Sequence, residues 1–424
     1  MDWQVASLRA RQWAHVRFTP EGVSLRGEAL AGLVSAAVAL PQAIAFAGLA
    51  GLPPQMGVWA CVIPLLLVGL LGELPLLVTG PVVSTSLVMF STLQLYALPG
   101  SSAYISDVAI VTLGAGLMQL LLSASGLVRL IEWIRAWGTE AITTSVGLTL
   151  ILSQVPYALG RTPAMLPNWQ KAWTCLAALG NSSVESFALF ALTLALGLAM
   201  GRLPPRIRQL RLALMLVAGS VAAWAFGLQV QKVGYARLGL PWTHILLDAQ
   251  TKAWLPQWAG LMLDVAVLSL LQSVVLCRAL KLRGACRRVS LRRQGLAQGL
   301  ANVVCALTGG YVSGASFNRT LTHEKAGARS MLALLFSAGF LLAAVLSAPS
   351  LIAQIPYPAM AAMLVMTALN MLEFHQARKR WFLAASSCAV IFTGVFLGLG
   401  LAVAFAFAIA VAQHLADTKE HRKD

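Results

Sequence analysis

Two long stretches without a charged residue, 29–72 and 75–106, constrain this chain more than any other feature. About 20 consecutive apolar residues cross the hydrocarbon core of a bilayer as a helix. The first stretch is more than twice that length, so it must turn back, and Gly51-Leu52-Pro53-Pro54 supplies the break. Charged residues make up only 11% of the chain, against roughly 25% in soluble proteins. The sequence therefore predicts an all-α polytopic membrane protein.

Hydropathy predicts about fourteen membrane-spanning segments, half of them in each half of the chain. Their approximate limits are 28–50, 54–72, 80–97, 106–125, 138–156, 183–201 and 210–229, then 256–278, 294–308, 314–326, 329–347, 350–371, 381–397 and 398–415. We expect a first seven-span repeat over 28–229, an extracytoplasmic connection over 230–255 and a second repeat over 256–415.

Basic residues are distributed unequally between the two sides of these segments. With the N-terminus inside, 25 of the 31 Lys and Arg residues fall in cytosolic segments and five fall outside. This bias matches the positive-inside rule, so it explains the net charge of +16 without a nucleic-acid partner. It predicts a multi-pass protein of the plasma membrane, a bacterial inner membrane, with a cytosolic arm (1–27) and a short cytosolic tail (416–424).

The cysteines and histidines give no sign of a metal or catalytic centre. Six residues of each type are scattered along the chain without metal-ligand spacing, and no nucleophile–base pair is recognisable. We expect no metal, no cofactor and no enzymatic activity.

Arg319 is the one basic residue that falls in neither set of loops. It lies within the glycine- and serine-rich segment GGYVSGASFNRTLTHEKAG, residues 309–327, which suits irregular backbone followed by a short helix. Ser313 or Ser316 is the expected N-cap of that helix. A helix N-terminus carries roughly half a positive charge and binds anions, and Arg319 adds a full charge within a turn. The alternative is that Arg319 extends to the cytosolic interface, but six helical residues put it about 9 Å deeper than Lys325.

A similar break occurs in the third segment, where LVTGPVVST reads as an extended stretch and then a helix opened by Pro81. The two broken segments are each third in their half of the chain. Gln42 precedes Gly80 by 38 residues, and Gln272 precedes Gly310 by the same number. Because seven is odd, the second repeat would run inverted, as in many secondary transporters with broken helices at the midplane.

Four ordered segments carry a specific resemblance: residues 32–72, TGPVVSTSLV at 79–88, QGLANVVCALTGGYVSGASFNRTLTHEKAGARS at 298–330 and IPYPAMAAMLVMTALNMLE at 355–373. They resemble the membrane domain of the SulP (sulfate permease) family of anion transporters. The resemblance implies a fourteen-span, seven-plus-seven inverted repeat with half-helices at spans 3 and 10. It also implies a core of spans 1–4 and 8–11, a gate of spans 5–7 and 12–14, and a homodimer.

The same resemblance implies an anion site between the N-termini of the third and tenth helices, served by elevator-type movement of core against gate. The residues carried over by position are Gln42 and Phe46 from the first span, Val82 and Val83 from the third, and Ser316, Phe317, Asn318 and Arg319 from the tenth.

Three departures from the family pattern limit what can be carried over. Gln272 stands where many prokaryotic members have a carboxylate linked to cation coupling, which favours exchange or uniport. Asn318 stands where the family usually has a smaller residue, so the identity of the transported anion cannot be inferred from the family. The chain ends shortly after the last span, so no cytosolic STAS domain is expected.

Three functions therefore stay open. The first is a secondary transporter or exchanger of sulfate, bicarbonate, chloride or dicarboxylates. The second is a nucleobase-type permease of the same architecture, and the third is an anion-sensing membrane protein without a transport cycle.

Overall fold

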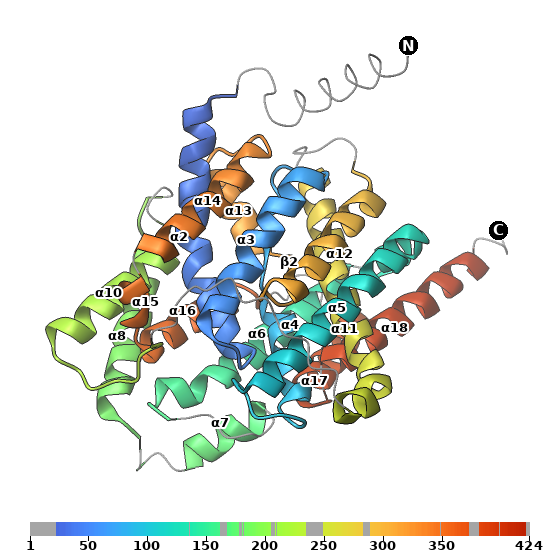
Figure 1. Ribbon diagram of the computed structural model, residues 1–424. Coiled ribbons are helices and arrows are strands. Elements are labelled where there is room, and N and C mark those ends of the chain that lie inside the picture. Colours follow the sequence, from blue (N-terminus) through green and yellow to red (C-terminus); the bar gives the residue numbers. More distant parts are fainter. Residues whose placement is uncertain are drawn as a thin grey trace.

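The computed structural model is built almost entirely of helices (Figure 1). It describes residues 23–134, 136–161, 168–177, 180, 182–204, 208, 210–234, 249–282, 289–347, 349–372, 381–397 and 399–420. Most of the predicted N-terminal arm, much of the predicted 230–255 connection and the last four residues lie outside these ranges.

The described residues of the first half form one two-residue strand among helices. Its elements are α2 (Leu25–Leu49), α3 (Pro54–Leu71), β1 (Thr79–Gly80), α4 (Val83–Leu93), α5 (Ser102–Ala124), the 3₁₀ segment η1 (Leu127–Trp133), α6 (Ala136–Ala158), α7 (Asn168–Ala177), α8 (Val184–Met200) and α10 (Arg211–Ala225).

Among its described residues, the second half also contains one two-residue strand. Its elements are α11 (Ala249–Leu282), α12 (Leu291–Leu307), β2 (Gly314–Ala315), α13 (Phe317–Lys325), α14 (Leu332–Ser347), α15 (Pro349–Ala353), α16 (Tyr357–Leu369), α17 (Trp381–Phe392), the π-helical segment η3 (Thr393–Leu397) and α18 (Leu399–Glu420).

Five of the described helices are long and apolar enough to cross a membrane, and seven shorter ones are apolar. The predicted helical class is confirmed, whereas the count of about fourteen spans and the inverted repeat stay predictions. Several boundaries differ from those expected. α11 begins seven residues earlier than its predicted span and α18 continues to Glu420, because polar residues at both places lower the local hydropathy. The predicted span 350–371 is divided into α15 and α16, and α7 lies between two predicted spans.

Serine side chains start many of these helices, and a glycine–proline break separates the first two. Ser24, Ser101, Ser183, Ser290 and Ser316 each accept a hydrogen bond from a first-turn amide. After α2, Gly51 adopts a left-handed φ of 70°, and Pro54 opens α3. The turn predicted in the first uncharged stretch is therefore confirmed.

The helices pack in two groups. One contains α2, α3, α5, α11, α12 and α14, and the other contains α6, α7, α8, α10, α16 and α17. Within the first group α5 and α12 approach closely because glycines face each other. A Cβ on Gly116 would lie 2.8 Å from the Val303 amide nitrogen, and one on Gly299 would lie 3.0 Å from the Gly116 carbonyl.

The two strands join the halves of the chain near the middle of the fold. β1 pairs antiparallel with β2, with Thr79 opposite Ala315 and Gly80 opposite Gly314. Each strand leads into a short helix, α4 with 11 residues and α13 with nine.

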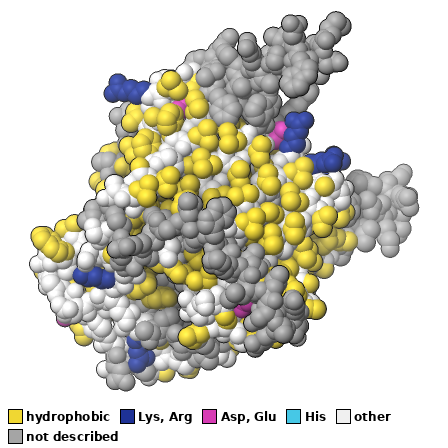
Figure 2. Space-filling view, in the orientation of Figure 1, with side chains coloured by type: hydrophobic (Ala, Val, Ile, Leu, Met, Phe, Trp, Pro, Cys, Tyr) yellow, Lys and Arg dark blue, Asp and Glu magenta, His cyan; other side chains and the backbone are white. Residues whose placement is uncertain are grey.

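Hydrophobic side chains cover the described centre of the face shown in Figure 2, and Lys and Arg side chains lie toward its margin. This distribution is the one expected for a surface in contact with lipid.

Glu28 links the start of α2 to the segment before α14. The Glu28 side chain is buried, and its carboxylate accepts hydrogen bonds from the Arg329 amide (2.9 Å), the Ser330 amide (3.0 Å) and the Ser330 hydroxyl (2.8 Å). A buried carboxylate with three donors is well compensated for its desolvation.

We expect Glu28→Ala to destabilise the protein by about 2–3 kcal/mol, because the buried Ser330 amide and the part-buried Arg329 amide lose their acceptor. Glu28→Gln keeps one acceptor oxygen, so its stability should lie between that of Glu28→Ala and that of the native protein. The measurement is the thermal unfolding midpoint in detergent. Glu185→Ala is the control, because Glu185 accepts one exposed hydrogen bond, from Gln229 N. Equal losses for Glu28→Ala and Glu185→Ala would contradict the assigned role of Glu28.

Candidate functional site

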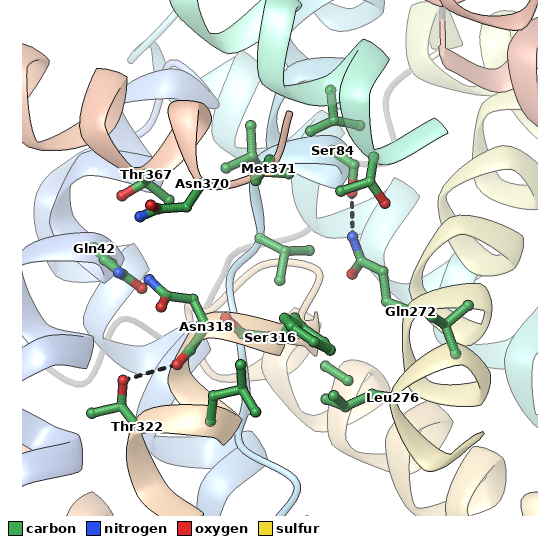
Figure 3. Close-up of a pocket in the computed structure, with 18 of the residues that line it drawn as sticks. Gln42, Ser84, Gln272, Leu276, Ser316, Asn318, Thr322, Thr367, Asn370 and Met371 are labelled. Atoms are coloured by element: carbon green, nitrogen blue, oxygen red, sulfur yellow. Dashed lines mark hydrogen bonds between the residues drawn. The ribbon is translucent and has the colours of Figure 1, made fainter. Parts of the chain in front are cut away.

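A cavity of about 1050 Å³ lies where the two groups of helices face each other. Its wall on the α2, α4, α11 and α13 side includes Val38, Gln42, Phe46, Val82, Val83, Ser84, Leu268, Leu271, Gln272, Val275, Leu276, Ala315, Ser316, Phe317, Asn318, Leu321, Thr322 and Lys325. Its opposite wall includes Thr139, Glu140, Ile142, Thr143, Val146, Gly201, Arg208, Arg211, Leu212, Thr367, Asn370 and Met371. Figure 3 shows ten of these residues labelled around the cavity.

The strand β2 is held at the cavity wall by a buried polar network centred on Ser313, the residue that precedes it. The Ser313 amide and hydroxyl donate to Asn302 Oδ1 at 2.9 and 2.7 Å. Its carbonyl accepts from Ser269 Oγ (2.8 Å), Gln298 Nε2 (3.0 Å) and Asn302 Nδ2 (3.2 Å), and Asn302 Nδ2 also donates to Gln119 Oε1 at 2.7 Å. Helices α5, α11 and α12 thus all contribute to fixing this extended segment. One of the two serines expected as the cap of α13 is therefore used elsewhere.

The N-terminus of α4 reaches the cavity without a side-chain cap. Val82 is the N-cap residue with an extended φ of −134°, and no side chain accepts from the first turn. The first amides of a helix have no intrahelical acceptor, so these groups are available to a ligand. The prediction that Pro81 opens this helix is wrong. Pro81 lies two residues before α4, because its carbonyl accepts from Arg319 Nη2 (2.7 Å) and the chain stays extended there.

The N-terminus of α13 reaches the same cavity from the other strand. Ser316 is its N-cap, and the Ser316 hydroxyl accepts from the Arg319 amide at 3.5 Å, so Ser316 of the two expected serines is the cap. Ser316, Phe317 and Asn318 all line the cavity, and Phe317 is 44% exposed. The two helix starts expected to share a site are therefore brought to one cavity.

Two amide side chains point toward each other across part of the cavity. Figure 3 shows the side chains of Gln42 from α2 and Asn318 from α13 in this arrangement, with Thr367 and Asn370 of α16 beside them. Gln42 is only 1% exposed, and its Nε2 has no hydrogen-bond partner in the described structure. A buried amide group without a partner is costly, so Gln42 is suited to meet a polar ligand.

Gln272 lies on the same wall and is tied to α4. Its Nε2 donates to Ser84 Oγ at 2.7 Å (Figure 3), whereas its Oε1 is buried without a partner in the described structure. A Cβ on Gly314 would lie 2.7 Å from that oxygen. Only glycine in β2 leaves room for Gln272 in this place.

Arg319 is buried as expected, at 1% exposed, but it does not line the cavity. Its Nη2 donates to the Pro81 carbonyl at 2.7 Å and its Nη1 to Cys61 Sγ at 3.2 Å. A Cβ on Gly80 would lie 2.7 Å from Nη1, so the guanidinium packs directly against β1. The charge therefore sits behind the N-terminus of α4, and of the predicted site residues Arg319 alone is absent from the cavity wall.

Sequence reasoning missed several charged residues of the cavity wall. The positive-inside count placed Arg208, Arg211 and Lys325 among the cytosolic cations, but Arg208 and Arg211 line the opposite wall and Lys325 lines the α13 side. Glu140 did carry a usable signal, because it is a charged residue inside a predicted span. No such signal marks Asn370, whose position depends on how α16 packs against α6 and α8.

The part of the chain that the structure describes contains no group of three or more His, Cys, Asp or Glu side chains that could hold a metal ion. The cavity chemistry is therefore that of amide, hydroxyl, apolar and a few charged groups around two helix starts.

The sequence model of the Sulfate permease family matches residues 25–394. The chain is 28% identical over 386 residues to a protein named Probable sulfate transporter MT1781 from Mycobacterium tuberculosis (strain CDC 1551 / Oshkosh). That alignment covers 88% of this chain and 68% of the relative.

Two solved structures share the fold. The transmembrane domain of a cyanobacterium bicarbonate transporter, BicA, aligns with a TM-score of 0.79 at 21% identity, covering 91% of this chain and 98% of that one. A murine Slc26a9 anion transporter in the inward-facing state aligns with a TM-score of 0.83 at 17% identity. That alignment covers 94% of this chain and 70% of the murine chain.

We expect Asn302→Ala to lower the free energy of unfolding by about 2–4 kcal/mol, because it leaves the buried Ser313 amide without an acceptor. Asn302→Asp keeps the acceptor for Ser313 but buries a carboxylate oxygen against two acceptors, Gln119 Oε1 and the Ser313 carbonyl, so it should cost at least as much. Both are measured by thermal unfolding in detergent. The control is Thr308→Ala at the end of the same helix, whose hydroxyl donates only to the Val304 carbonyl. A cost for Asn302→Ala no larger than for Thr308→Ala would show that the network does not hold β2.

Proposed function

We propose that this chain, which belongs to the sulfate permease family, is a secondary transporter or exchanger of small anions of the sulfate, bicarbonate, chloride or dicarboxylate class. The proposed anion site lies between the N-termini of α4 and α13. Relatives in this family are named as transporters, and none of the described cavity features calls for an enzymatic reaction.

One observation carries the proposal: two helix N-termini, each preceded by an extended strand, open onto a single cavity. Unpaired first-turn amides and the helix dipole favour negative charge at such an end. Two of them at one site select an anion over a cation. The strand pairing keeps the two ends together, because Gly80 and Gly314 are directly opposite each other.

Neutral side chains would complete the anion shell. Gln42 and Asn318 offer amide donors that add no charge to the cavity, and Phe46 can turn its positive ring edge toward an anion. Val82 and Val83 provide an apolar surface that limits the water around the ligand.

Arg319 would act on the anion through its field and through Pro81 rather than by contact. Its guanidinium holds the Pro81 carbonyl, one residue before the N-cap of α4, so it fixes the direction of the first-turn amides. Its full positive charge in a poorly hydrated interior also favours an anion nearby. Arg319 is thus proposed as a positioning and electrostatic residue.

We further propose that the two packed groups are the core and gate of a seven-plus-seven inverted repeat. α4 and α13 would be the half-helices of spans 3 and 10, and the repeats would cover 28–229 and 256–415, joined by the 230–255 connection. The cavity is walled by both groups, so an elevator-type displacement of the core along the gate would carry the anion across the membrane.

The conformation is proposed to face the cytosol. Arg208 and Lys325, two exposed residues of the cavity wall, belong to segments that the positive-inside rule places in the cytosol. The proposed location is the bacterial inner membrane with both termini cytosolic, and the proposed assembly is a homodimer. Gln272 cannot titrate, so exchange or uniport is favoured over cation-coupled symport.

The direct test is a flux panel in proteoliposomes with sulfate, bicarbonate, chloride, nitrate and dicarboxylates, with and without pH and sodium gradients. Uptake of at least one anion, independent of both gradients, is the expected result. Uracil is included in the panel, because uptake of uracil without anion uptake would favour a nucleobase permease. Binding of an anion without flux would favour a sensor.

We expect Arg319→Ala to reduce anion uptake roughly ten- to a hundredfold, which corresponds to about 1.4–2.8 kcal/mol. Arg319→Lys keeps the charge but cannot reproduce a planar guanidinium on two acceptors, so intermediate uptake is expected. Uptake is compared at equal amounts of monodisperse protein. Undiminished uptake by the folded Arg319→Ala or Arg319→Lys variant would contradict the role assigned to Arg319.

Gln42→Leu should raise the KM for the anion roughly tenfold with little change in stability, because it removes a cavity-facing amide that has no protein partner. Gln94→Leu is the matched control, since Gln94 is buried in the fold but does not line the cavity. The two variants are compared by initial uptake rates over a range of anion concentrations. A similar KM for both variants would remove Gln42 from the site.

A further inference from the structure

The charged residues of the cavity wall are unequal in sign. Among the described residues that line it, Arg208, Arg211 and Lys325 are basic and Glu140 alone is acidic. The remaining lining residues are neutral. The wall therefore carries a net positive charge that the two helix ends do not account for.

Arg211 is the least exposed cation of this set. It is the first residue of α10 and is half-buried, whereas Arg208 and Lys325 are exposed. Its Nη2 donates to Asn370 Oδ1 at 3.4 Å, and its Nη1 would lie 3.5 Å from a Cβ on Gly201. The contact with Asn370 and the neighbouring Gly201 place the guanidinium at the cavity wall formed by α10 and α16.

We propose that Arg211, supported by Arg208 and Lys325, makes the transporter favour divalent over monovalent anions. This inference rests on the proposed function and adds a charge preference to it. The amide and hydroxyl side chains at the helix ends are neutral and recognise oxygen atoms or a halide by hydrogen bonding. Arg211 adds a full positive charge on the opposite wall to the field of the helix ends and Arg319, and its Coulomb energy with a ligand is proportional to the charge of that ligand.

This proportionality gives a quantitative signature. If removing the charge of Arg211 raises the KM of a monovalent anion by a given factor, the KM of a divalent anion at the same place should rise by the square of that factor. We expect roughly threefold for chloride or nitrate and roughly ninefold for sulfate, with both factors falling as inert salt is added.

The experiment compares native protein, Arg211→Gln and Arg211→Lys in proteoliposomes. The monovalent anion is measured by uptake, and sulfate is measured by uptake or by competition with the monovalent flux. Arg211→Lys keeps the charge and should retain the native preference. Arg202→Gln is the matched control, because Arg202 is an exposed arginine of the same α8–α10 connection that does not line the cavity.

Equal factors for the two anions in Arg211→Gln, or the same shift in Arg202→Gln, would overturn the proposal. If Arg211→Gln does not fold, Lys325→Gln at an exposed position serves as the second variant. It should also lower the preference for divalent anions. Absence of flux in the native protein would instead refute the proposed transport function. The two failures are therefore distinguishable.

Discussion

The pairing of two short extended segments in the interior is the constraint on which the rest of this structure depends. Backbone that leaves the helical conformation at membrane depth must find hydrogen-bond partners within the protein. β1 and β2 meet this requirement partly by pairing with each other. The remainder is supplied by side chains: Asn302 and Gln298 bind the Ser313 backbone, Thr320 Oγ1 accepts from the Val78 amide, and Arg319 donates to the Pro81 carbonyl.

This arrangement assigns the polar side chains behind the strands and those in the cavity to different tasks. Gly80 and Gly314 face each other in the strand pair, and each leaves space for one polar side chain, Arg319 at Gly80 and Gln272 at Gly314. The groups behind the strands are largely satisfied by backbone, which makes the segment rigid. The groups in front, above all Gln42 and the first turn of α4, keep free hydrogen-bonding capacity for a ligand.

The eight predicted site residues came from the family resemblance, and the local sequence supplied separate signals for the chain breaks around them. The glycine and prolines at 51–54 mark a turn, and Ser316, one of the two serines expected as a cap, starts α13. The equal offsets from Gln42 and Gln272 are the basis of the proposed two-repeat organisation. Seven of the eight predicted site residues line the cavity, and the resemblance to the sulfate permease family is confirmed by the match over residues 25–394. The start of α4 was misplaced because Pro81 is held by a residue 238 positions away.

By itself, the sequence determined the helical class, the family and the segments that break, because hydropathy, chain breaks and short motifs depend on neighbours in the chain. Only the tertiary structure decided where the charges point. Arg319 and Arg211 are both basic residues near helix starts. The Arg319 side chain packs against the strand pair, whereas the Arg211 side chain lines the cavity. That difference depends on contacts between helices far apart in sequence, with Pro81 and Cys61 for Arg319 and Asn370 for Arg211. The direction of a long side chain is fixed by such packing, and the order of residues along one helix does not contain it.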